Sequence, residues 1–117
     1  MFALNANAAL IELDAGSFTP AASVITFGEH VYGTVNPVYD FGTYTVTFDG
    51  YFVGGEGTPT VGIPLTLDPN SPQTHITSDG ANPTSPVLSG TPLFNGPIAV
   101  LFSEDVAAVG LGGQVEI

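Results

Sequence analysis

Short runs of β-branched and aromatic residues recur along the chain, and Gly or Pro separates them about every five residues. The 117 residues include 15 Gly and 10 Pro, so few windows are long enough for a helix. Gly and Pro are unfavourable inside helices, whereas Val, Ile, Thr, Phe and Tyr favour strands. The pattern therefore predicts an all-β protein.

Apolar and polar residues alternate most regularly over Thr43–Phe52. Tyr44, Val46 and Phe48 share one face of an extended chain there, and Thr residues with Asp49 share the other. Successive side chains of a strand point to opposite sides, so this stretch is predicted to be a strand. The Gly that follows Asp49 predicts either a hairpin turn or a bulge within a longer strand.

Further short strands are expected where apolar, β-branched or aromatic residues cluster. They are Ala8–Leu13, Ser23–Phe27, Val61–Leu67, His75–Thr77, Pro97–Phe102 and Val106–Leu111. The Pro97–Phe102 run is continuously apolar and is predicted to be buried on both faces. Residues 68–92 hold five Pro and are expected to form a long loop, broken at most by His75–Thr77. We expect residues 1–117 to form a single domain, an antiparallel β-sandwich.

The charge of the chain limits its partners. There is no Lys or Arg, and 11 Asp and Glu give a formal net charge of −11. Nucleic acids and anionic membrane surfaces are excluded as partners, because proteins bind both through Lys and Arg. No apolar run is long enough for a membrane-spanning helix, so membrane insertion is not expected. With no Lys or Arg to pair with the carboxylates, we expect a bound cation, calcium above all, to neutralise some of them.

Two groups of Asp, Asn and Glu side chains have spacings that suit a calcium ion. Glu12 and Asp14 are two apart, so in a strand they share a face and can offer oxygens to one cation, or act as acid and base on a sugar. Asp68, Asn70 and Asp79 match the first, third and last positions of a twelve-residue calcium loop, although Gln73 stands where that loop requires Gly. The alternative for this segment is a solvated turn in which Asp and Asn cap their own backbone.

Catalysis is not expected. The histidines, His30 and His75, are interpreted as surface-loop residues, and no Gly-x-Ser-x-Gly motif accompanies them. The absence of Cys excludes thiol nucleophiles and disulfides. Tyr32 and Tyr39 are predicted to lie in a loop and to stack on a ligand such as a sugar ring.

Four segments together resemble exported bacterial proteins of the class that carries a PEP-CTERM sorting tail. The segments are Gly16–Phe18, Ile25–Glu29, Gly33–Tyr39 and Leu93–Leu111. The resemblance implies a jelly-roll β-sandwich at the cell surface or in the matrix, which holds structural calcium and binds polysaccharide. It implies a calcium site formed near the first strand together with an acidic residue late in the chain. Glu12, Asp14 and Asp105 are residues of the type that such a site requires. It also implies that the chain is the N-terminal portion of such a domain.

Two hypotheses follow. The first is a secreted or cell-surface module, non-enzymatic and calcium-stabilised, that binds glycans or matrix. The alternative is a structural subunit that assembles into a filament, lattice or matrix through exposed strand edges, since a sandwich incomplete in one chain is completed by another.

Overall fold

The computed structural model describes residues 11, 13–54, 65–80 and 86–111. The chain divides into two units, Met1–Ala22 with Val109–Ile117 and Ser23–Ala108. In the smaller unit, η1 (Ala15–Ser17) is a single 3₁₀ turn, closed where the backbone N–H of Ser17 donates to the carbonyl of Asp14 at 2.8 Å. The larger unit contains every strand of the described residues. The single domain expected from the sequence stays a prediction.

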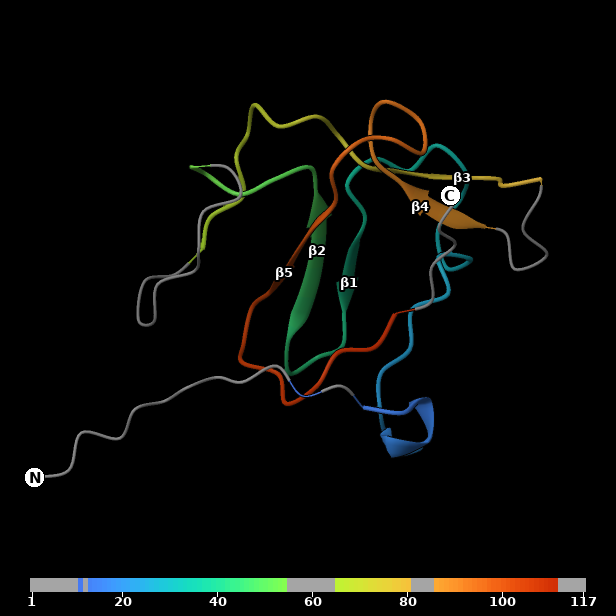
Figure 1. Cartoon of the computed structure of the whole chain (residues 1–117), viewed down its shortest axis with the longest axis vertical. Helices are drawn as coiled ribbons and strands as arrows, with labels where there is room; N and C mark the ends of the chain where they lie inside the picture. The colour runs from blue at the N-terminus through green and yellow to red at the C-terminus, as the bar shows by residue number, and fades with distance from the viewer. Residues whose placement is uncertain (1–10, 12, 55–64, 81–85, 112–117) are drawn as a thin grey trace, which may run out of the picture. The chain divides into compact units, whose positions relative to one another are not determined.

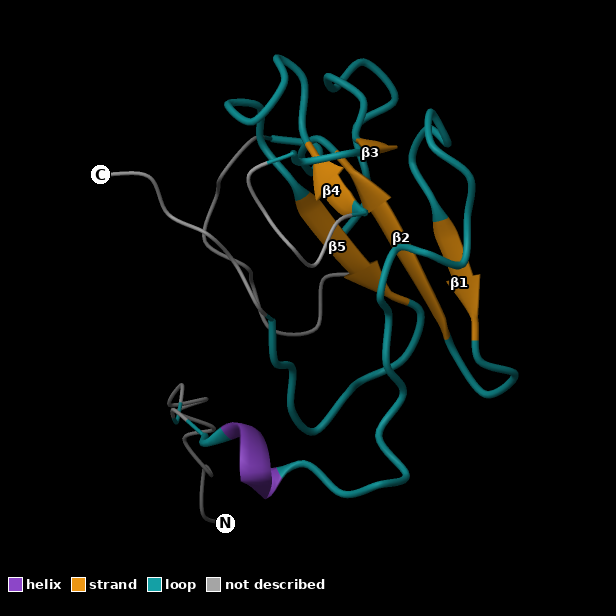
Figure 2. Cartoon of the chain, turned by 90° about the vertical axis from the view of Figure 1, so that its right-hand side faces the viewer, coloured by secondary structure: helices purple, strands orange, loops and turns teal. Residues whose placement is uncertain are grey.

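Within the described residues, five short strands form two antiparallel sheets (Figure 1). The first sheet has the order β1-β2-β5, from β1 (Val38–Asp40), β2 (Thr45–Asp49) and β5 (Ala99–Phe102). The second pairs β3 (His75–Thr77) with β4 (Val87–Ser89). Long loops connect the strands (Figure 2), and the described residues contain no α-helix. The all-β class and the antiparallel pairing are therefore confirmed.

The core lies on one face of the three-stranded sheet. The register places Tyr39 opposite Val46, and Val46 opposite Phe102, so that these side chains project to the same side. Tyr39, Val46 and Phe48 are buried. Half-buried apolar side chains pack against this cluster: Ile25, Phe27, Phe41, Tyr44, Leu88 and Phe102. Leu88 belongs to β4, so the second sheet also contributes to this core.

Aromatic rings meet edge to face in the cluster. The ring centroids of Phe27 and Phe48 are 5.5 Å apart, and those of Tyr39 and Phe48 are 6.0 Å apart. Such T-shaped pairs add attraction beyond the burial of apolar area. They help a short sheet with few buried residues to hold a defined core.

Backbone hydrogen bonds connect the loop that precedes β1 to β3 and to the residue before it. The N–H of Asn36 donates to the carbonyl of Thr74 at 2.9 Å, and the N–H of Ile76 donates to the carbonyl of Thr34 at 3.0 Å. Val35 and His75 form an isolated bridge between these bonds. These contacts connect the two-stranded sheet to the loop that leads into β1 of the three-stranded sheet.

Several predicted strands are found in the structure. The alternating stretch contains β2, with Val46 and Phe48 buried, and His75–Thr77 forms β3. The Pro97–Phe102 run contains β5, but it is not buried on both faces, because β5 is an outer strand and Val100 stays 36% exposed.

Other expectations are wrong. Ser23–Phe27 forms no strand; Phe27, at the end of this stretch, has a left-handed backbone (φ 64°), and its ring packs against the core. Residues 106–111 also form no strand and are exposed. The 68–92 region is not one loop broken only at β3, since it also contains β4.

The Asp-Gly pair after β2 gives neither a hairpin nor a bulge. Phe52 instead bridges to Leu67. A Cβ on Gly50 would collide with the backbone carbonyl of Pro72, so the chain leaves the sheet where another segment crosses it closely. Most of Ala8–Leu13 and part of Val61–Leu67 lie outside the described residues.

Candidate functional site

An open hollow lies on the surface of the larger unit. It has a volume of about 410 Å³ and is lined by Gly28, Glu29, His30, Val31, Tyr32 and Pro86. Five of these residues are consecutive in the loop that leads to β1, and Pro86 directly precedes β4. We call this site the loop hollow. It brings a carboxylate, an imidazole and a phenol together on one surface.

Two hydrogen bonds from a nearby threonine fix the Glu29 carboxylate. The backbone N–H of Thr26 donates to Oε1 at 2.8 Å, and the Thr26 hydroxyl donates to Oε2 at 2.7 Å. Burial raises the pKa of Glu29, but these hydrogen bonds and the charge of His30 outweigh it and hold the pKa below its ordinary value of 4.5. Glu29 is therefore an exposed, ionised acceptor at neutral pH.

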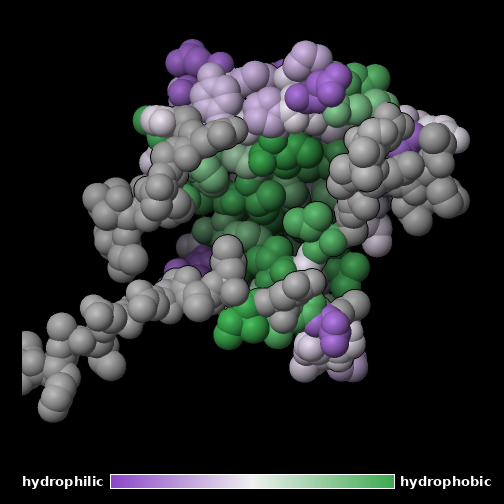
Figure 3. Space-filling view, viewed as in Figure 1, coloured by the Kyte–Doolittle hydropathy of each residue, from purple (hydrophilic) through white to green (hydrophobic). Residues whose placement is uncertain are grey.

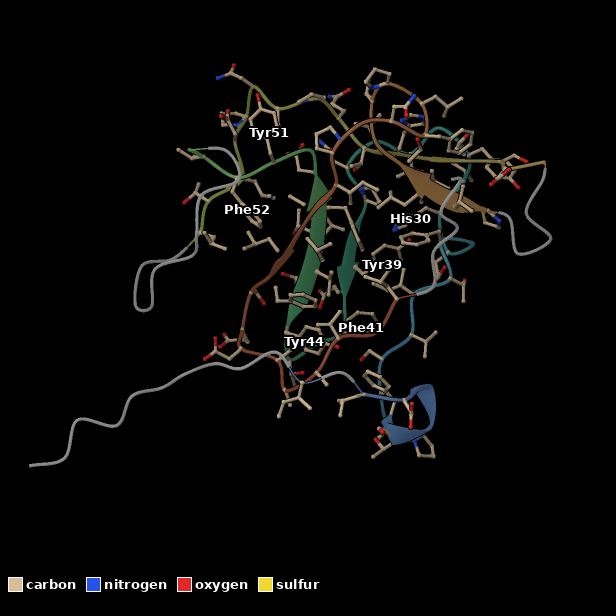
Figure 4. The ribbon with its side chains drawn as sticks, viewed as in Figure 1. His30, Tyr39, Phe41, Tyr44, Tyr51 and Phe52 are labelled. Carbon is tan, nitrogen blue, oxygen red and sulfur yellow. The ribbon has the colours of Figure 1, made fainter. Side chains whose placement is uncertain are left out.

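His30 fastens the loop to the outer edge of β1. Its Nε2 lies 3.3 Å from the carbonyl oxygen of Val38, and because a carbonyl only accepts, Nε2 carries the proton in this contact. The imidazole meets the ring of Tyr39 edge to face, with centroids 4.9 Å apart (Figure 4). His30 thus has a positioning role in addition to its place in the hollow.

The two tyrosines predicted to bind a ligand differ sharply. Tyr32 lines the hollow and is 60% exposed, so its ring is open to a flat partner. Tyr39 does not lie in a loop but in β1, and it is only 6% exposed. Its ring belongs to the core, so Tyr32 alone offers the expected stacking surface.

The hydroxyl of Tyr39 is buried and makes no hydrogen bond within the described part of the chain. Burial, with a smaller contribution from the charge of Glu29, raises the pKa of Tyr39 to about 12. Tyr39 thus carries an unsatisfied polar atom directly beneath the loop that forms the hollow.

The predicted calcium ligands are not gathered into one site by the described residues. Asn70 donates its backbone N–H to Oδ1 of Asp68 at 2.8 Å, and Ser71 donates its backbone N–H to the carbonyl of Asp68 at 3.0 Å. This geometry is the capped turn that was the alternative to a calcium loop. Asp79 lies beyond β3 in the same stretch.

The remaining predicted ligands belong to different parts of the chain. Glu12 lies outside the described residues, Asp14 precedes η1 in the smaller unit, and Asp105 is exposed after β5. Across the described ranges no three His, Asp or Glu side chains are placed to hold one metal ion. Calcium binding stays a prediction.

Two polar contacts that organise the fold were not predicted from the sequence. The Asp49 carboxylate accepts hydrogen bonds from the Gly50 N–H at 2.7 Å and the Ser71 hydroxyl at 2.8 Å. The Asn36 side-chain oxygen accepts from both the N–H and the hydroxyl of Thr74. The Asn-Pro bend after Val35 was the available signal, but nothing local identifies Thr74 as the partner.

Comparisons with protein-family models, with curated proteins and with solved structures give no match. The resemblance to PEP-CTERM proteins therefore stays a prediction. None of the helical segments in the described ranges is long and apolar enough to cross a membrane.

Proposed function

We propose that this chain is a non-enzymatic, extracellular module that binds a glycan in the loop hollow. The observation that carries the proposal is that the exposed ring of Tyr32 and the fixed, ionised carboxylate of Glu29 line the same hollow. An aromatic ring stacks on the apolar face of a sugar, and a carboxylate accepts hydrogen bonds from its hydroxyls. The hollow supplies both kinds of contact on one surface.

The charge of the chain selects the class of glycan. With no Lys or Arg and a net charge of −11, the protein has no cationic side chain, apart from a protonated His, to pair with sulfates or uronates. Glu29 repels such groups at close range. The ligand is therefore a neutral glycan or one that carries amino groups. Because the hollow is open, an internal unit of a long polymer can enter it as readily as a chain end.

Two substitutions test the proposal against a panel of neutral, amino-bearing and sulfated oligosaccharides. Tyr32→Ala should weaken the affinity for the bound class about tenfold or more, a loss of about 1.4 kcal/mol, because it removes the ring on which the sugar stacks. Glu29→Gln should lower the affinity for amino-bearing glycans more than the affinity for neutral ones. The matched controls, Phe94→Ala and Glu104→Gln, change an exposed aromatic and an exposed carboxylate outside the hollow. Isothermal titration calorimetry measures each affinity.

Two outcomes would count against this function. The first is that no member of the panel binds the unmodified chain. The second is that Tyr32→Ala binds as tightly as Phe94→Ala does. A preference for sulfated over neutral glycans would contradict the proposed charge selection.

We also propose that the two sheets belong to a β-sandwich of jelly-roll type. Leu88 of β4 packs against the core cluster of the three-stranded sheet, as expected when two sheets face each other across a core. Nuclear Overhauser contacts between Leu88 and the side chains of the three-stranded sheet would test this, and sheets that share no common core would contradict it.

The alternative function, a structural subunit that assembles through strand edges, is supported by a separate observation. In the order β1-β2-β5 both β1 and β5 are outer strands, and the described residues add no further strand to either. Exposed strand edges pair readily with other chains.

A further inference from the structure

Strand β5 presents an open backbone edge. The N–H of Ser103 donates to the carbonyl of Thr45, which places alternate residues of β5 toward β2. In an antiparallel ladder the residues between them direct their N–H and C=O groups to the other side. These residues are Val100 and Phe102, and no strand of the described part pairs with that side.

The edge of β5 lacks the usual protection against pairing. Native edges carry Lys, Pro, a bulge or an inward charge, whereas β5 reads Ala-Val-Leu-Phe and the whole chain has no Lys. Ile98 is exposed and Val100 partly exposed, so apolar side chains accompany the open backbone. On the face seen in Figure 3, hydrophobic residues gather over the region of β2 and β5.

The distribution of charge indicates what can cover this edge. All 11 carboxylates lie outside residues 80–103, the stretch that contains β4 and β5. Two copies of a chain with a net charge of −11 repel each other, and neither has Lys or Arg to form salt bridges with the other. Within this stretch the described residues 86–103 carry no carboxylate of their own, so two copies that meet along the outer side of β5 bring none of these residues' charges into contact. A basic partner would instead prefer the acidic parts of the surface.

We propose that two copies of this chain associate through β5, in antiparallel orientation about a two-fold axis. Val100 of one copy then pairs with Phe102 of the other, and the three-stranded sheets join into one continuous sheet of six strands. The inference rests on the assembly alternative and is independent of glycan binding. Because charge repulsion opposes the contact, sodium chloride strengthens it.

Sedimentation velocity of the full chain over a range of concentrations tests the proposal. The unmodified chain should shift from its monomer mass of 12.0 kDa toward twice that mass as concentration rises. Val100→Pro removes an N–H that faces away from β2, so it should weaken association at least tenfold while the fold persists. Leu101→Pro removes an N–H that faces β2 and should unfold the chain, which checks the assignment of the two edges.

If Val100→Pro unfolds as well, a charge variant tests whether the copies associate through β5. Ile98→Glu places a carboxylate beside the shared edge, whereas Val24→Glu adds the same charge at an exposed position outside β5. Ile98→Glu should weaken association at least tenfold relative to Val24→Glu. A chain that stays monomeric at millimolar concentration overturns the proposal. So does a dimer that dissociates on addition of salt or is equally stable in both Glu variants. Tyr32→Ala should leave the dimer intact, so failure here and failure of glycan binding remain distinct.

Discussion

At the scale of single residues, Tyr39 combines a structural role with an energetic cost. Its ring contacts Phe27, His30 and Phe48, so it connects the loop hollow to the core. Its hydroxyl is buried without a hydrogen-bond partner in the described part of the chain. A buried unsatisfied hydroxyl destabilises a fold by roughly 1–3 kcal/mol. The packing of the Tyr39 ring stabilises the native state, whereas its buried hydroxyl destabilises it.

We therefore expect Tyr39→Phe to leave stability at neutral pH unchanged or to raise it by about 1 kcal/mol. Because the pKa of Tyr39 is raised from 10.0 to about 12, the stability that its neutral form contributes is fully present below pH 10. The unmodified chain then loses roughly 2 kcal/mol as the pH rises from 10 to 12, since the unfolded state ionises first. Urea denaturation at pH 7, 10 and 12 measures both effects.

The Phe variant supplies its own control at high pH. It should lose less stability between pH 10 and 12 than the unmodified chain, because it has no hydroxyl at this position to ionise. Equal losses in the two proteins, or a strong destabilisation at pH 7, would show that the Tyr39 oxygen has a partner in solution.

At the scale of structural elements, Asn36 joins the loop before β1 to β3. It has a left-handed backbone (φ 44°), which Asn tolerates better than most residues. Its side-chain oxygen lies 2.8 Å from the N–H and 3.1 Å from the hydroxyl of Thr74, a residue with no exposed surface. The Asn36 side chain therefore satisfies two donors of a fully buried residue that directly precedes β3.

Asn36→Ala should lower the free energy of unfolding by about 2–4 kcal/mol, because it leaves both Thr74 donors unpaired and strains the backbone. Two further variants separate the part of this loss due to backbone strain from the part due to the unpaired Thr74 donors. Asn36→Gly relieves the backbone but not the donors, and Asn36→Asp keeps an acceptor in place. Chemical denaturation should rank Asp above Gly and Gly above Ala. If Ala proves as stable as Asp, the hydrogen bonds to Thr74 contribute nothing.

Elements that depend on local pattern were predictable, and those that depend on distant partners were not. The alternation around Val46 identifies β2, because one face of that strand meets the core and the other meets water. Ser23–Phe27 has equal β propensity, yet packing of the Phe27 ring against Tyr39 and Phe48 overrides it. β4 is only three residues long and lies among Pro and Ser, so its pairing with β3 leaves no periodic signal.

The same distinction holds for the site. The exposure of Tyr32 follows from its place in a polar loop and was anticipated. The hollow itself requires Pro86 to lie against residues 28–32, a contact between distant parts of the sequence. Glu29 gave no signal of its own, because its fixed orientation comes from Thr26 in a turn whose shape depends on the core.

At the scale of the whole molecule, the net charge of −11 destabilises the folded state. Like charges within about a Debye length, ~10 Å at 0.1 M salt, repel each other more strongly in the compact state than in the extended chain. Any added electrolyte therefore stabilises the fold by screening. Calcium at a specific site adds a second contribution, since a ligand that binds only the native state stabilises it by mass action.

The last prediction separates these two contributions. Calcium chloride should raise the melting temperature above the value in sodium chloride of equal ionic strength, and chelator should reverse the rise. At a calcium concentration ten times the dissociation constant, the free energy of unfolding gains about 1.4 kcal/mol. Asp68→Asn and Asp105→Asn should reduce the effect if these carboxylates bind the ion, whereas Asp40→Asn, which alters an exposed carboxylate in β1, serves as the control. Melting curves that coincide in calcium and ionic-strength-matched sodium would mean that the carboxylates are only screened, and that no calcium site forms.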